Sequence, residues 1–85
     1  MKYKQIENTN IYRGITVDKN GKKSVFAMIG TVRELAEKEI IFLDGKKPND
    51  LWIALIPKMG DISSREYDTF EECKEFAEKM EHRLR

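Results

Sequence analysis

The feature that most constrains the fold is an unbroken apolar run, LWIALI at residues 51–56, in a chain of only 85 residues. Successive side chains of a strand point to opposite faces of its sheet. The run therefore places Leu51, Ile53 and Leu55 on one face and three apolar side chains, including Trp52, on the other. A chain of this length buries only about 60–65% of its unfolded surface, so both faces of this strand compete for limited cover.

Two further stretches are apolar on both faces, namely residues 24–29 (SVFAMI) and 40–43 (IIFL). A sheet of four or five strands is about 20 Å wide, and two helices of about 10 Å each cover one face fully or both faces by half. Three arrangements are consistent with this pattern. Either helices or sheet curvature cover both faces, or a homodimer pairs exposed faces, or one face stays open for a different protein.

Alternating apolar residues predict strands over residues 11–17 and 24–29. Between them, the Asn20-Gly21 pair is typical of a two-residue type I′ hairpin turn, because both positions need positive φ. No linker or low-complexity segment interrupts the chain, so residues 1–85 are expected to form a single domain. Further strands are expected over residues 40–43 and 51–57, with part of 62–68 pairing back.

A Thr-x-x-Glu sequence opens both predicted helices, at Thr31 and at Thr69. This spacing is typical of a capping box, in which the two side chains satisfy free N–H groups at the helix start. In the second helix an apolar stripe follows the helical repeat, and its members are Phe70, Cys73, Ala77, Met80 and Leu84. The sequence thus predicts an α+β fold, a mostly antiparallel sheet of four to five strands with a short helix (about 31–39) and a long C-terminal helix (about 70–84).

Composition excludes several classes of protein. The single cysteine, Cys73, permits no internal disulfide, and 16 basic against 15 acidic residues leave a net charge of +1. A nucleic-acid role would therefore depend on a local patch rather than on bulk charge. The N-terminal residues lack the apolar core of a secretory signal, and no segment has the roughly 20 apolar residues of a membrane span. These features predict a soluble protein of the cytoplasm, or of the host-cell cytoplasm if a phage encodes it.

No motif predicts catalysis, a cofactor or a metal. His82 lies near the end of the second helix, where a cation suits the helix dipole, and Cys73 lies on the apolar stripe. These two are the only soft ligands, too few for a zinc site. The DKNGKKS loop carries Lys22 where an EF-hand needs an oxygen ligand, and Thr16 occupies the first glycine position of a phosphate-binding loop. The sequence predicts a protein that is not an enzyme.

The leading hypothesis is a protein-binding module whose partner is a different protein or a second copy. Its interface would centre on Trp52, Ile56, Phe26 and Met28, because tryptophan and methionine provide large or adaptable contact area. On this hypothesis Trp52→Ala would abolish partner capture with little loss of fold. In size and charge density the chain resembles short phage and prophage proteins, many of which act on a host protein as inhibitors or adaptors.

The alternative hypothesis is nucleic-acid binding. Lys22-Lys23 and Lys46-Lys47 occupy two predicted loop tips, and Arg13 would join them in neutralising phosphates. YRGITVDKNGKKSVFAMI followed by YDTFEECKEFAEKM resembles AP2-type and integrase arm-type domains, which implies that three strands read DNA while a helix braces the sheet. An additional helix and strand interrupt the pattern. The similar residues are Tyr12, Arg13, Gly14, Gly21, Lys22, Phe26, Ala27 and Ile29, then Thr69, Phe70, Glu71 and Glu72.

Overall fold

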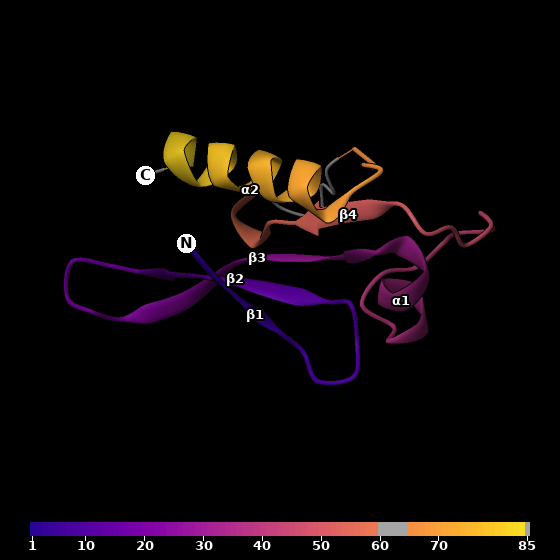
Figure 1. Cartoon of the computed structure of the whole chain (residues 1–85), viewed down its shortest axis with the longest axis horizontal. Helices are drawn as coiled ribbons and strands as arrows, with labels where there is room; N and C mark the ends of the chain where they lie inside the picture. The colour runs from indigo at the N-terminus through magenta and orange to yellow at the C-terminus, as the bar shows by residue number, and fades with distance from the viewer. Residues whose placement is uncertain (60–64, 85) are drawn as a thin grey trace.

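The computed structural model describes residues 1–59 and 65–84. It confirms the α+β fold: an antiparallel sheet in the order β1-β2-β3-β4, with a long helix along one face and a short helix at one end of the other (Figure 1). The elements are β1 (Lys2–Gln5), β2 (Tyr12–Val17), β3 (Lys23–Thr31), α1 (Val32–Glu37), β4 (Trp52–Leu55), the 3-10 turn η1 (Pro57–Met59) and α2 (Phe70–Leu84).

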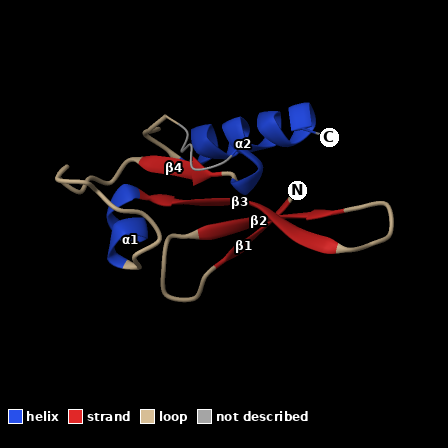
Figure 2. Cartoon of the chain, turned by 180° about the vertical axis from the view of Figure 1, so that it is seen from behind, coloured by secondary structure: helices blue, strands red, loops and turns tan. Residues whose placement is uncertain are grey.

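The larger core lies between the sheet and α2. Seven residues are buried in this cluster, namely Phe26, Ala27, Ile29, Ala54, Ile56, Cys73 and Ala77. The Thr69 hydroxyl accepts a hydrogen bond from the N–H of Glu72 and donates one to its carboxylate, so part of the predicted capping box forms. The apolar stripe of α2 is thus anchored over β3 and β4 (Figure 2).

A smaller core lies on the second face, beneath α1. Ile11, Val32, Leu35 and Ile53 are buried there. Part of the capping box predicted for α1 forms, with the Thr31 hydroxyl accepting the N–H of Glu34 at 3.2 Å. The carboxylate of Glu34, which a capping box would direct to the start of the helix, instead binds the β1–β2 loop. It accepts the N–H and the side-chain amide of Asn10, each at 2.8 Å. The LWIALI strand therefore has cover on both faces, from α2 on one and from α1 on the other.

The predicted strand at residues 40–43 is wrong. This segment is a loop between α1 and β4, bounded by positive φ at Glu39 (59°) and Asp44 (55°). Ile41 and Leu43 pack against the smaller core, whereas Phe42 is 86% exposed. The alternation that resembled a strand arises because every second side chain of the loop points inward, without any ladder of hydrogen bonds.

The β2–β3 turn also differs from the predicted type I′ form. Only Gly21 has positive φ (80°), and its N–H bonds to the carbonyl of Asp18 at 3.0 Å. The Asp18 carboxylate accepts the N–H groups of Asn20 and Lys22, each at 2.8 Å. These bonds stabilise a three-residue turn with a left-handed glycine, a common alternative hairpin geometry.

A β-bulge changes which face the hairpin residues occupy. Gly14 pairs with Ala27, but the next residue, Ile15, pairs with Val25, so Phe26 is the extra residue. Phe26 and Ala27 both pack in the larger core. Because Val25 lies opposite Ile15, it faces away from α2, as does every second residue toward the hairpin tip.

At the other edge of the sheet, Tyr67 pairs with Trp52 through two backbone hydrogen bonds of 2.7 and 2.8 Å. The prediction that part of residues 62–68 pairs back is confirmed at this bridge. Residues 62–64 of the prediction lie outside the described residues.

Candidate functional site

The four residues predicted as an interface do not form one exposed surface. Phe26 and Ile56 are only 5% and 2% exposed beneath α2. Trp52 packs half-buried on the same side. Met28 lies on the opposite face, where it borders the smaller core. Three of the four side chains therefore belong to the packing of α2.

Trp52 is part of an aromatic cluster at the start of α2. Its ring lies 5.5 Å from that of Phe70 at a 74° interplanar angle, which is an edge-to-face contact. The Phe70 ring also contacts Tyr12, at 4.5 Å, and Tyr3, at 5.9 Å. Contacts of this geometry stabilise a fold beyond the area that they bury. The cluster joins the first turn of α2 to β1, β2 and β4.

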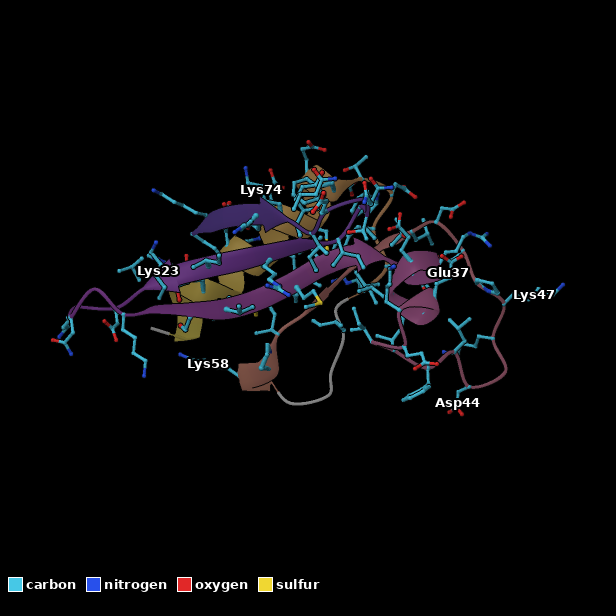
Figure 3. All side chains as sticks on the ribbon, turned by 90° about the horizontal axis from the view of Figure 1, so that it is seen from below. Lys23, Glu37, Asp44, Lys47, Lys58 and Lys74 are labelled. Atoms are coloured by element: carbon cyan, nitrogen blue, oxygen red, sulfur yellow. The ribbon has the colours of Figure 1, made fainter. Side chains whose placement is uncertain are left out.

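The lysines of the nucleic-acid hypothesis also lie apart. Lys22 and Lys23 lie at the β2–β3 hairpin, whereas Lys46 and Lys47 lie in the α1–β4 loop at the opposite end of the long axis (Figure 3), along which the molecule extends 42 Å. Arg13 lies between these ends, on β2. The two lysine pairs thus form no common patch.

One part of the sheet is only partly covered by the rest of the described chain. It is the half of the second face beyond α1, toward the β2–β3 hairpin, and Figure 3 looks onto it. The strand register assigns nine side chains to this surface, which we call the open face: Lys2, Lys4, Arg13, Ile15, Val17, Lys23, Val25, Met28 and Leu55.

The open face is organised in rows across the strands. Lys4 and Arg13 lie directly opposite each other, and the row continues through Met28 and Leu55. The next row contains Lys2, Ile15 and Val25, and the last contains Val17 and Lys23. Val17 is 50% exposed and Val25 47%, while Ile15, Met28 and Leu55 are half-buried. The surface therefore combines five apolar and four basic side chains.

The acidic side chains of Glu7 and Glu81 border the open face. Glu7 lines a hollow with Lys4 and Arg13 beyond the last residue of β1. Glu81 of α2 lines another hollow with four open-face residues, Lys2, Ile15, Val17 and Lys23. Its carboxylate lies 3.8 Å from the Met1 amino nitrogen. The four cations give the open face a positive potential, which Glu7 and Glu81 offset at its borders.

Aromatic side chains are excluded from the open face. The four aromatic residues of the strands point to the α2 side, where Phe26 is buried and the rings of Tyr3, Tyr12 and Trp52 contact Phe70. The open face therefore provides aliphatic contacts and positive charge, but no ring on which a base could stack.

The β2–β3 hairpin carries hydroxyl side chains on the α2 side and apolar side chains on the open face. Thr16 and Ser24 pair on the α2 side, with their hydroxyl oxygens 3.3 Å apart. The apolar Val17 and Val25 lie on the open face, where solvent reaches about half of each side chain. Each row of the open face, from the row of Leu55 to the row of Val17, therefore contains at least one apolar side chain.

The described residues give little indication of metal binding or of thiol and imidazole chemistry. Within residues 1–59 and 65–84, no three histidine, cysteine or carboxylate side chains lie close enough to hold a metal ion. Cys73 is fully buried, and His82 lies exposed near the end of α2. Across the described chain, no helix has both the length and the apolar character needed to cross a membrane.

Comparison of the chain with protein-family models, with curated proteins and with solved structures finds no match. The candidate site therefore depends on the geometry of the open face alone. Three of its strands, β2, β3 and β4, were predicted, but β1, which contributes Lys2 and Lys4, was not. A signal was present in the alternation of Lys2, Tyr3 and Lys4, where one aromatic residue points inward between two cations.

Proposed function

We propose that this chain is a non-enzymatic binding module that captures a protein partner through the open face. The single observation that carries the proposal is the half-exposed pair Val17 and Val25, which extends an apolar surface outward from the smaller core. An apolar centre with a charged border is the usual composition of a protein-binding surface. An inhibitor or adaptor needs no more than such a surface, and this is the role that we propose.

The energy available from this surface suits reversible binding. Complete burial of a valine contributes about 1.5–3 kcal/mol, so covering the exposed halves of Val17 and Val25 contributes about 1 kcal/mol each. The half-buried Ile15, Met28 and Leu55 add less per residue. Ion pairs at the basic border would add mainly to association rate and orientation. Alanine at either valine should therefore weaken binding, and a carboxylate there should abolish it.

Site-specific photocrosslinking tests the proposal. A photoreactive residue replaces Val25 on the open face or, as the matched control, Lys79 on the exposed side of α2. We expect one protein of the source cell to be crosslinked from position 25 and not from position 79, and Val17→Asp to remove that product. Equal products from both positions, or a product that persists in the Val17→Asp variant, would contradict the proposal.

Nucleic-acid binding remains the second candidate, because Lys2, Lys4, Arg13 and Lys23 extend across one face. The resemblance to sheet-reading DNA-binding domains supports the same face, opposite the bracing helix. Each phosphate contact steepens the salt dependence of duplex binding by about 0.9 log units per log unit of salt. On this reading, replacing Lys4 and Arg13 by glutamate abolishes DNA binding in low salt. The matched Lys46→Glu, Lys47→Glu variant binds as the wild type does.

A further inference from the structure

We infer that the open face receives an amphipathic helix of the partner protein, with an apolar stripe flanked by acidic residues. This inference rests on the proposed function and specifies its partner. It follows from three properties of the open face: the separation of its apolar and basic side chains, its length, and the sign of its charge.

In the two rows nearest α1, the basic side chains lie nearer β1 and the apolar side chains nearer β4. The order is reversed in the last row, where Val17 is on β2 and Lys23 on β3. Lys2, Lys4 and Arg13 lie on the β1–β2 side, whereas Met28 and Leu55 lie on the β3–β4 side. A helix lying along the strands would place its apolar stripe over β3 and the hairpin. Residues next to that stripe would then lie above β1 and β2, where carboxylates would meet the cations. Over the two rows nearest α1, charge complementarity therefore places the acidic flank of the helix above β1 and β2.

The length of the open face matches a short helix. Val17 is four residue steps from Arg13 along β2, which corresponds to about 13 Å of strand. A helix covers this distance in about nine residues, or two and a half turns. At one end the smaller core under α1 already occupies the face, so a docked helix would end against Leu55 and Met28. Its contacts would follow the i, i+3, i+4, i+7 pattern of groove-bound helices.

A second copy of the chain fits the open face poorly. A two-fold, face-to-face pair presents the same surface from both sides. Such a pair would bring the four cations of each copy into one interface, with Glu7 and Glu81 as the bordering carboxylates. Nucleic acid fits poorly for a different reason, because the centre of the surface is aliphatic. Such side chains neither donate hydrogen bonds to base edges nor stack on bases.

Selection from a random peptide display library tests the inference directly. The wild-type protein is the bait, and a Val25→Asp variant with unchanged circular dichroism is the counter-selection target. If aspartate disrupts the fold, Val25→Ser replaces it. We expect enriched peptides with apolar residues at the helical spacing and acidic residues on one flank. Lys4→Glu with Arg13→Glu should weaken their binding by about tenfold or more, whereas Lys46→Glu with Lys47→Glu should not.

The other outcomes each overturn the inference. Enriched peptides without helical periodicity, or with basic flanks, would show that the occupant is not an acidic helix. No enrichment over the counter-selection would reject a helix, while crosslinking from position 25 would still decide the proposed function independently. Duplex DNA binding lost in the Lys4, Arg13 variant would assign the face to nucleic acid. A dimer by light scattering that Val25→Asp dissociates would assign it to a second copy.

Discussion

Trp52→Ala distinguishes a packing role of this side chain from an interface role. The substitution removes a ring that contacts Phe70 at 5.5 Å and lies 6.4 Å from the ring of Tyr12. A half-buried indole that loses about 120 Å² of buried apolar area costs about 3 kcal/mol, and the lost ring contacts raise this to about 3–4 kcal/mol. Since a chain of 85 residues has a stability of about 4–13 kcal/mol, the loss would be a large fraction of the total.

Urea unfolding followed by far-UV circular dichroism measures this loss without the tryptophan, which is the only one in the chain. In thermal unfolding, the midpoint of Trp52→Ala should lie roughly 12–30 °C below that of the wild type. The matched control is Val25→Ala on the open face, where the loss should stay below about 1 kcal/mol because the side chain is half exposed. A loss below about 1 kcal/mol for Trp52→Ala would refute the reasoning and return Trp52 to the interface.

Two further predictions concern the smaller core and the β1 edge. Leu35→Ala should destabilise the protein by about 3 kcal/mol, because Leu35 is fully buried. Urea unfolding followed by Trp52 fluorescence measures this loss, and the control Glu37→Ala, at an exposed position, should change stability by less than about 0.5 kcal/mol. Similar losses in both variants would contradict this role of Leu35. Burial, and then the charge of Glu78, raise the pKa of Tyr3 above its ordinary range. Because the folded-state pKa is the higher one, the contribution to stability is present below the ordinary tyrosine pKa and is lost as the pH rises above it. Tyr3→Phe should therefore lessen the alkaline loss of stability, and an unchanged pH profile would contradict this.

The elements with long-range periodicity could be predicted from the sequence. The strands around the Asn20-Gly21 turn alternate, and the C-terminal helix combines a cap at Thr69 with an apolar stripe, so local propensity and tertiary packing agree. The loop at residues 40–43 could not be distinguished from a strand. Its side chains alternate between the core and solvent with the same period as a strand, and residues with positive φ, Glu39 and Asp44, bound the segment.

The candidate site was harder to predict because it depends on registration between strands. The assignment of Val25 to the face opposite Phe26 and Ala27 follows from a bulge that no periodic pattern reveals. The strand β1 was missed because KYKQ contains a single apolar side chain, Tyr3. Its pairing with β2 aligns Lys2 and Lys4 with the open face, which neither segment predicts alone. Phe26 was predicted as an interface residue but is buried under α2, and the sequence alone does not give the position of that helix on the sheet.

The open face is explained by the unequal sizes of the two helices. α2 has 15 residues and covers the aromatic side of the sheet, whereas α1 has six and reaches only the part of the second face around Gly30, where Leu35 lies 3.1 Å from the site of a β-carbon. The aliphatic stems of Lys and Arg side chains shield neighbouring apolar surface and keep it soluble. Solubility alone, however, would not require valines on this side of the hairpin and hydroxyl groups on the other. The β-branched side chains of Val17 and Val25 favour the extended backbone of the hairpin. Because solvent reaches about half of each side chain, both valines are placed where the proposed partner would cover them.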